Sequence, residues 1–572
     1  MELYGQVLVA LLAIFLISKI LQLCRTVLWR PYAVTRSFRK QGIMGPRYSL
    51  VSGSLKEMRK LQKDALEMVL DTHSHDITDR IVPHYNRWGD VYVLARNRAK
   101  DFHFRPRAGQ TRQDWIRHKK IINPAFNIDK LKVITREMAT CIISLLKEWE
   151  NQVCASEDKC KTMEIKGEFK RLSADILARA AFGSSYIEGR EAFKAQTQIQ
   201  DYCVASKSTM FIPGSQYLPT PSNIRIWKLD MIVKNTIRNI IKGRMNAEAT
   251  GSSDGYGDDI LGLMIGASTM VQSRSDLKLK MDEIIDECKS FFFAGNETTA
   301  VLLTWTVFLL CVHPEWQSKL REEVLKELGG QIPDVDMLAN LKMVNMVLLE
   351  ALRLYGPSQE LTREASRDVK LGNITIPKGT GIIIPSIKIH RSKKYWGEDA
   401  EEFNPLRFAN GISQAAKNPH ALLVFGLGPR ACIGQTFAML KAKMVMALIL
   451  QRFSFSLSPE YKHTPENMVL LEALRLYDPT MELFREALGD MKLGNIIISK
   501  DIGIIIPTMK IHRSKNYWGE DAEEFNPLRL ANRISQVAKN PQALLAFRSG
   551  PRVCIGQTFT MLEAKMAMAL IL

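Results

Sequence analysis

A cysteine in a glycine-rich turn constrains this chain more than any other feature. Residues 425–434 read FGLGPRACIG, so Cys432 follows two glycines, a proline and an arginine. Glycine allows backbone turns that other residues avoid and lets a flat ligand approach closely. Backbone N–H groups of such a turn can donate to the sulfur, and Arg430 can pair with an anion. The segment predicts either a rigid loop that presents a metal-bound thiolate or a buried, inert cysteine.

The same loop occurs a second time near the end of the chain. Residues 347–450 recur as 469–572 without a gap, with 79 of 104 positions identical, and Cys554 corresponds to Cys432. The second copy carries Arg548 in place of a loop glycine and has no long helix of its own. We therefore expect one complete site, on Cys432, with Cys554 as the competing ligand.

Length and charge restrict the classes of function. The chain has 572 residues, of which 46% are hydrophobic, so it can bury a large core. Its net charge of +18 is not accompanied by a nucleic-acid motif or by interleaved aromatic and basic residues, and we expect no nucleic-acid partner. Anionic lipid or an acidic electron donor suits this charge better. Nine scattered cysteines without a C-x-x-C pair indicate neither a disulfide framework nor zinc.

The N-terminus predicts a membrane anchor. The segment 7–23 is nearly all apolar and would span roughly 25 Å as a helix, near the lower limit for a bilayer. A cleaved signal peptide is the competing interpretation, but no small-residue cleavage site follows. Arginines and lysines between residues 25 and 40 then predict a cytosolic body. The segments 29–32 and 42–46 resemble a hinge.

Hydrophobic periodicity predicts a mainly helical body with small β-sheets. Helices are expected at 128–150, 223–245, 282–312 and 341–355. Residues 374–385, ITIPKGTGIIIP, predict a β-hairpin, and 251–259 predict a flexible loop. His73 and His75 lack partners at ligand spacing, so a polar surface loop is expected there rather than a metal site.

The long helix contains the segment FFFAGNETTA, residues 291–300. Ala294 and Thr298 are four residues apart and share one helix face. The Thr298 hydroxyl can bond the Ala294 carbonyl, and the small Ala294 and flexible Gly295 leave room for a flat ligand. With Glu297 beside it, this forms a polar notch that could pass protons. The alternative is a simple glycine–threonine kink in a core helix.

Two further pairs stand at helical spacing. Glu350 and Arg353 form E-x-x-R, where an isolated pair stabilises a helix by only tenths of a kcal/mol. Trp115 and Lys119 are one turn apart in TRQDWIRHKK, which also fits an ordinary basic amphipathic helix.

Together, F-x-x-G-x-R-x-C-x-G, A-G-x-E-T-T and E-x-x-R resemble the cytochrome P450 family, most closely its plant microsomal branch that oxidises hormones, fatty acids and terpenoids. The resemblance covers residues from about 20 to 465. It implies a cytochrome P450-like fold, mainly α with small β-sheets, and an N-terminal transmembrane helix. The implied organisation is an anchor at 1–24, a haem-thiolate domain at 25–465 and a partial duplicate at 466–572.

The resemblance also implies roles for residues. Cys432 would be the axial ligand of haem b, within a loop that includes Phe425 and Gly434. The residues that would activate oxygen are Ala294, Gly295, Glu297 and Thr298. The expected propionate partners are Trp115, Lys119, Arg363 and Arg430, with Lys119 in place of the usual arginine. Glu350 and Arg353 would form a structural network with Arg407.

The implied function is a monooxygenase of the endoplasmic reticulum membrane that faces the cytosol. It would accept electrons from NADPH-cytochrome P450 reductase and insert one atom of O2 into a lipophilic small molecule. Two departures leave alternatives open: the chain between Gly89 and Trp115 is short, and the terminal sheet breaks off near residue 465. These alternatives are an inactive paralogue or mis-joined gene model, and an O2-independent haem-thiolate isomerase, against which the Glu297–Thr298 pair argues.

Overall fold

The computed structural model describes a helical body and several isolated parts of the chain. The structure describes almost every residue in the ranges 29–43, 75–83, 112–183, 191–199, 219–251, 255–269 and 279–459. Shorter described pieces are 95–96, 483–486, 491–493, 496–498, 503–506 and 513–518, with single residues at 18, 25, 61, 65, 71, 461 and 522. The expected anchor, His73, most of the short segment after Gly89, Arg548 and Cys554 lie outside the described residues.

The helix α12 (Met281–Val312) runs through the centre of the body, as the sequence predicted. Its start is capped by the Glu283 carboxylate, which accepts the Lys280 N–H at 2.7 Å. It ends where Pro314 opens the next helix, α13 (Pro314–Leu328). Among the described helices, α12 alone is long and apolar enough to span a membrane, but 61% of its most apolar stretch is buried. It therefore serves as a core helix here.

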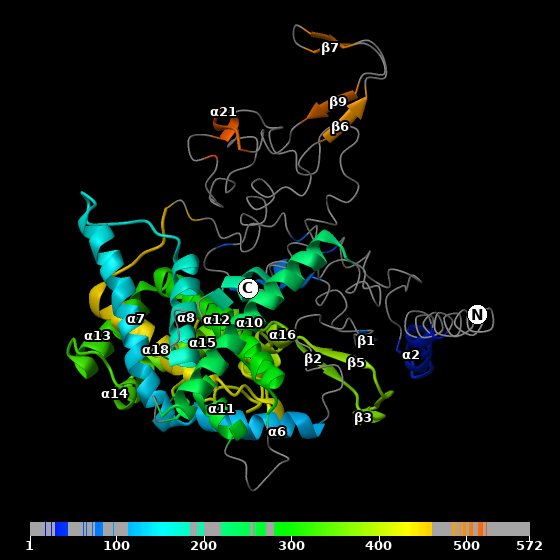
Figure 1. Ribbon diagram of the computed structural model, residues 1–572, viewed down its shortest axis with the longest axis horizontal. Helices are drawn as coiled ribbons and strands as arrows, with labels where there is room; N and C mark the ends of the chain where they lie inside the picture. The colour runs from blue at the N-terminus through cyan, green and yellow to red at the C-terminus, as the bar shows by residue number, and fades with distance from the viewer. Residues whose placement is uncertain are drawn as a thin grey trace.

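Other helices surround α12, and most lie together in Figure 1. They are α6 (Arg112–Ile122), α7 (Ile128–Cys154), α8 (Ile165–Phe182), α10 (Pro221–Ala249), α11 (Ile260–Thr269), α14 (Val335–Asn340), α15 (Lys342–Tyr355) and α18 (Gln435–Arg452). Shorter ones are α2 (Arg30–Lys40), α4 (Thr78–Ile81), α16 (Ser386–His390), α17 (Lys393–Trp396) and the 3-10 turns η2 (Asn123–Phe126), η6 (Pro405–Phe408) and η7 (Gly428–Arg430). The predicted helices at 128–150, 223–245 and 341–355 are confirmed as α7, α10 and α15.

Small sheets lie to one side of the helices (Figure 1). The strands β1 (Ala95–Arg96), β5 (Gly381–Ile384) and β2 (Leu361–Glu364) form one antiparallel sheet, and β3 (Val369–Leu371) pairs with β4 (Ile374–Ile376). The prediction of one hairpin over 374–385 is wrong, because β4 and β5 belong to different sheets. The two residues Gly372 and Asn373 connect β3 to β4, and the short glycine turn sets their register, Leu371 opposite Ile374.

The second copy repeats this pairing. The strand β6 (Leu483–Glu486) pairs with β9 (Gly503–Ile506), and β7 (Met491–Leu493) with β8 (Ile496–Ile498), in the registers of the first copy. The short helix α21 (Lys515–Trp518) likewise repeats α17. Local sequence therefore determines these strand pairs in both copies.

Two local predictions near the N-terminus are wrong. The expected hinge at 29–32 instead opens α2, with a proline in its first turn. Just after α2, Gln41 exchanges two hydrogen bonds with the backbone of Thr375, at 2.7 and 2.9 Å.

His75 is not on the surface: it is 3% exposed, and its Nδ1 lies 2.9 Å from the Tyr355 hydroxyl. A partner so distant in sequence leaves no local signal.

The expected terminal sheet is absent from the described residues after α18. Residues 453–459 carry no strand there. Instead, the Gln317 side chain of α13 bonds both backbone groups of Phe455, at 3.1 and 2.8 Å. This amide replaces the partner strand that an extended segment usually needs.

Candidate functional site

The cysteine loop is a tight turn that contains η7 and directly precedes α18. The Cys432 N–H donates to the Phe425 carbonyl at 2.8 Å, which closes the loop. Gly426 and Gly428 have φ of +66° and +72°, so the predicted need for glycine is met at both positions. Gly434 differs, because its φ is −88° and an added Cβ would meet only Phe126, at 3.9 Å. Glycine is therefore not required by the backbone at 434.

The Cys432 side chain is exposed on the open face of this loop. Nearby protein atoms displace water from part of the sulfur and so raise the pKa of the thiol. A hydrogen bond from the Gly434 N–H acts in the opposite direction. The loop by itself thus favours the protonated thiol. A bound metal cation would displace that proton, since a coordinating thiol is deprotonated by the metal charge.

The hydrogen bond predicted between Thr298 and Ala294 of α12 is present, and these two residues are called the notch below. Ala294 and Thr298 are both exposed, although they lie midway along a largely buried helix. The Thr298 Oγ1 donates to the Ala294 carbonyl at 2.6 Å, as expected from the spacing. Exposed residues in the middle of a core helix indicate an open space beside them.

Gly295 and Glu297 face another helix. An added Cβ on Gly295 would lie 2.9 Å from the Leu177 Cδ2 atom of α8, so this glycine allows close packing of two helices. Glu297 is mostly buried and pairs with Lys170 of α8, with 3.3 Å between Nζ and Oε2. Nothing in the local sequence pointed to Lys170, because α8 is far away along the chain.

Three cations lie at or near the cysteine loop. Lys119 of α6 donates to the Pro429 carbonyl at 2.8 Å. Burial lowers the pKa of Arg430, and the positive charge of Arg363 acts in the same direction. Trp115 lies one turn before Lys119 on α6, and its side chain is outside the described part of the chain.

A buried ionic network joins α15 to the chain segments that precede the loop. Arg353 and Glu350 are both fully buried and share two hydrogen bonds, of 2.8 and 2.7 Å. Arg407 lies 3.6 Å from the same carboxylate and bonds Asp399 at 2.8 Å. The predicted triad is confirmed, and Asp399 is a member that the sequence motifs did not reveal.

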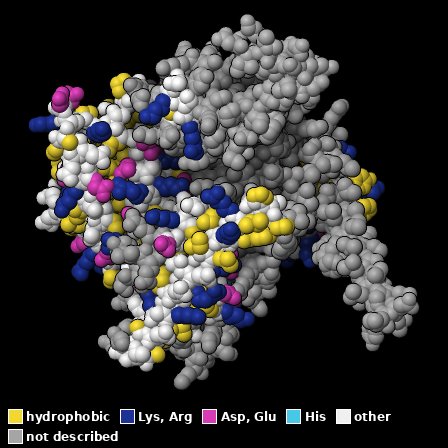
Figure 2. All heavy atoms as spheres, turned by 45° about the horizontal axis from the view of Figure 1, so that its top comes forward, with side chains coloured by type: hydrophobic (Ala, Val, Ile, Leu, Met, Phe, Trp, Pro, Cys, Tyr) yellow, Lys and Arg dark blue, Asp and Glu magenta, His cyan; other side chains and the backbone are white. Residues whose placement is uncertain are grey.

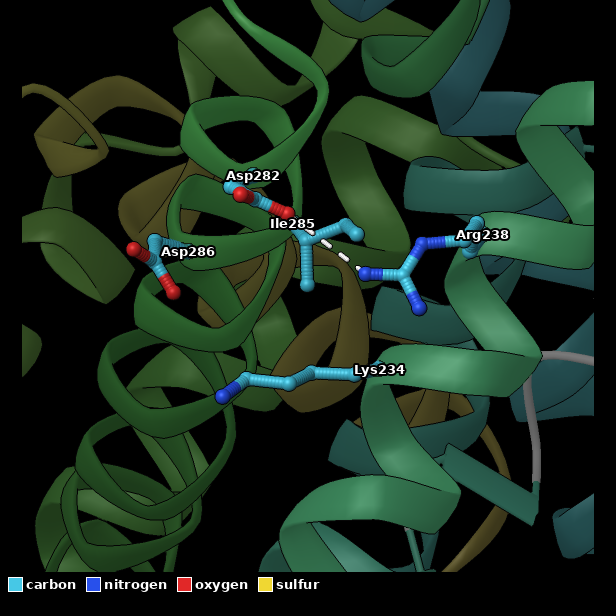
Figure 3. Close-up of a pocket in the computed structure, with 5 residues that line it drawn as sticks. All are labelled: Lys234, Arg238, Asp282, Ile285 and Asp286. Atoms are coloured by element: carbon cyan, nitrogen blue, oxygen red, sulfur yellow. Dashed lines mark hydrogen bonds and ion pairs between the residues drawn. The ribbon is translucent and has the colours of Figure 1, made fainter.

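A separate hollow of about 430 Å³ lies between α10 and the first turns of α12 (Figure 3). Its lining residues are Lys234, Arg238, Asp282, Ile285 and Asp286. Arg238 pairs with Asp282 at 3.5 Å. Asp282 precedes Ala294 by about 18 Å of helix, so this hollow is distinct from the notch.

The donor set fits a haem group. An exposed sulfur stands on a glycine turn, cations flank the turn, and a core helix has an exposed alanine and threonine. A flat anionic macrocycle with a thiolate-preferring metal matches each of these features. Among the described residues, no cluster of three or more histidines, cysteines or carboxylates offers another metal site.

Comparison with known proteins agrees with this site. The sequence model of the family "Cytochrome P450" matches residues 44–467 and again 466–572. Cytochrome P450 709B3 of Arabidopsis thaliana is 47% identical over 490 residues, which cover 79% of this chain and 94% of the relative. Cytochrome P450 CYP72A616 of Paris polyphylla is 40% identical, covering 78% and 92%. Secologanin synthase 1 of Catharanthus roseus is 36% identical, covering 77% and 91%. This chain belongs to the cytochrome P450 family of haem-thiolate monooxygenases.

Proposed function

We propose that the chain is a membrane-anchored monooxygenase that inserts one oxygen atom of O2 into a lipophilic small molecule. Its electrons come from NADPH-cytochrome P450 reductase, and its body faces the cytosol at the endoplasmic reticulum. One observation carries the proposal: an exposed sulfur on a glycine turn accompanies an exposed alanine–threonine pair on a core helix. The first would suit ligation of haem iron, and the second would leave room for a small ligand beside α12.

In this proposal Cys432 holds haem b, and Lys119, Arg363 and Arg430 bind its propionates. Their positions at or near the loop support this assignment, because guanidinium and ammonium groups are the usual partners of carboxylates. Haem supplies the one-electron and O2 chemistry when bound. Phe425 contributes the carbonyl that closes the loop.

Thr298 would position a water molecule in the open space beside α12, from which a proton could be delivered. Its hydroxyl donates to the Ala294 carbonyl, so its oxygen can still accept a hydrogen bond from water in the open space. Glu297 is directed toward α8 by its ion pair with Lys170. Thr298 is therefore the polar group at the open face of the notch, whereas Glu297 lies on the side of α12 that faces α8.

The outer surface suits a membrane and an apolar substrate. Large apolar side chains are exposed on α10, including Trp227 at 41% and Met231 at 59%. On the face shown in Figure 2, hydrophobic side chains lie next to Lys and Arg. An apolar surface bordered by basic residues favours contact with anionic lipid.

The test is the absorption spectrum of the reduced full-length chain with carbon monoxide. We expect the wild type and Cys554→Ala to give a thiolate-type band and Cys432→Ala to lose it, because one sulfur ligates the iron. Cys160→Ser is the matched control, since Cys160 is also an exposed free cysteine. A band retained in Cys432→Ala would contradict the assignment of this ligand. A wild-type chain that takes up no haem would support an inactive paralogue.

A further inference from the structure

A buried lysine lies beneath the notch. Lys441 of α18 is 0% exposed. Its Nζ donates to the Gly295 carbonyl at 3.0 Å and to the Ser173 hydroxyl at 3.0 Å. Ser173 in turn donates to the Asn296 carbonyl at 2.8 Å. Two consecutive carbonyls of α12, directly after Ala294, are thus held by one amine and the hydroxyl that it contacts.

The position of Lys441 joins the two sides of the site. The helix α18 begins at Gln435, three residues after Cys432. Lys441 lies about 9 Å further along the same helix axis. The helix α18 therefore directly follows the cysteine loop and, through Lys441, contacts the backbone of α12 next to the notch.

The second copy shows that this position is not a generic part of the fold. Glu563 corresponds to Lys441 within the otherwise similar segments MLKAKM and MLEAKM. An ionised carboxylate has no N–H or O–H to donate to a carbonyl. An ionised glutamate at this position could therefore not donate the hydrogen bonds that Lys441 makes.

The surroundings of the amine are apolar. Burial lowers the pKa of Lys441 to about 7, and its Nζ lies 5.4 Å from the centre of the Phe437 ring. Charged groups on the helices that pack near it have partners of their own. These pairs are Lys170 with Glu297, Glu150 with Arg452, Lys132 with Asp336, Glu350 with Arg353, and Glu323 with the N–H groups of Met343 and Val344.

We propose that Lys441 is a positioning residue, which sets where the Thr298 notch stands relative to the Cys432 sulfur by holding the Gly295 and Asn296 carbonyls. The catalytic consequence of this inference rests on the proposed function. Its structural part stands without haem, because every bond involved lies within the chain. Burial favours the neutral amine, which still has N–H groups to donate to both partners, so the contact is most stable above the pH at which Lys441 loses its proton.

Hydrogen–deuterium exchange of the purified full chain tests the grip. We expect Lys441→Met to speed exchange at the amides of residues 295–300 about tenfold, which corresponds to about 1.4 kcal/mol and to the loss of about one hydrogen bond. Lys441→Gln keeps a donor and should restore part of the protection. Lys443→Met is the matched control, since Lys443 also lies on α18 but donates to the Leu338 carbonyl of α14, at 3.2 Å.

The pH dependence separates this role from general packing. After correction for intrinsic exchange, protection of 295–300 in the wild type should strengthen as pH rises above about 7, because the opened state keeps a proton on Lys441 that the closed state releases. Lys441→Met should lack this step, and Lys443→Met should keep it. Equal exchange in the wild type and Lys441→Met, or the same change in Lys443→Met, would overturn the proposal.

A second readout uses the haem-loaded protein with its reductase. We expect Lys441→Met to release severalfold more hydrogen peroxide per NADPH consumed, with an unchanged carbon monoxide spectrum. Lys443→Met should match the wild type. Unchanged peroxide release in Lys441→Met would refute the catalytic part of the inference. Failure of the wild type to bind haem would instead refute the proposed function, and the exchange result would stand by itself.

Discussion

At the scale of single residues, the role of Thr298 depends on its position rather than on its chemistry. Thr304 lies on the same helix and makes the same bond, from Oγ1 to the carbonyl four residues before it, at 2.8 Å. Thr298 is exposed beside Ala294, whereas Thr304 is half-buried. The two threonines therefore form a matched pair that differs in access to the open space.

We expect Thr298→Ala to lower product formation per NADPH at least about tenfold, because it removes the oxygen that would hold a water molecule for proton delivery, and positioned proton transfer typically contributes about 10²–10⁴-fold. Hydrogen peroxide should account for the missing electrons. Thr304→Ala should behave as the wild type, and both variants should bind haem normally. Equal product yields from Thr298→Ala and the wild type would remove Thr298 from the proposed proton path.

At the scale of secondary-structure elements, α15 is tied to the segments before the cysteine loop by the Arg353 side chain. Besides Glu350, Arg353 donates to the carbonyls of His390 at 2.7 Å and Glu402 at 3.0 Å. Glu350 also accepts the Asn404 N–H at 3.0 Å. A buried charge of this kind has no water to replace a lost partner.

Arg353→Met should therefore lower the free energy of unfolding by about 3–5 kcal/mol, since the buried Glu350 carboxylate would lose its two shortest hydrogen bonds and its closest cation. Urea unfolding followed by circular dichroism measures this. Arg171→Ala is the control: Arg171 pairs with Glu148 at 2.7 Å on the surface, and its loss should cost less than about 1 kcal/mol. Similar losses in the two variants would show that the Arg353 network adds no more than a surface pair.

At the scale of the whole molecule, acid should unfold the body through groups that cannot take up protons while folded. His390 is 2% exposed and accepts the Leu423 N–H at 2.9 Å. Burial lowers its pKa to about 3, and the charges of Arg391 and Arg353 act in the same direction. The folded chain thus keeps His390 neutral at pH values where the unfolded chain protonates it.

Between pH 6.5 and 3 the unfolded state binds a proton that the folded state does not, so stability should fall as pH falls, by at most about 1.4 kcal/mol per pH unit from this group. His390→Gln keeps an acceptor for Leu423 and removes the titration. Thermal melting from pH 7 to 4 should show a shallower decline in His390→Gln than in the wild type. Parallel declines would mean that other groups, such as Glu283, dominate the acid unfolding.

Features that depend on neighbouring residues along the chain could be predicted from the sequence. The left-handed turns at Gly426 and Gly428, the Thr298 bond to the carbonyl one turn earlier, and the span of α12 all follow from local backbone preferences and helical spacing. The repeated strand registers of the second copy show the same local control.

Only the tertiary structure decided which distant groups meet. His75 is buried against Tyr355, Lys170 pairs with Glu297, and Lys441 grips Gly295, and none of these pairs has a sequence signature. The reason is physical: a buried polar group must find a partner, but which partner it finds depends on how helices far apart in the chain pack. Side-chain type and spacing made the cysteine loop and the notch predictable, while helix packing placed the charges around them.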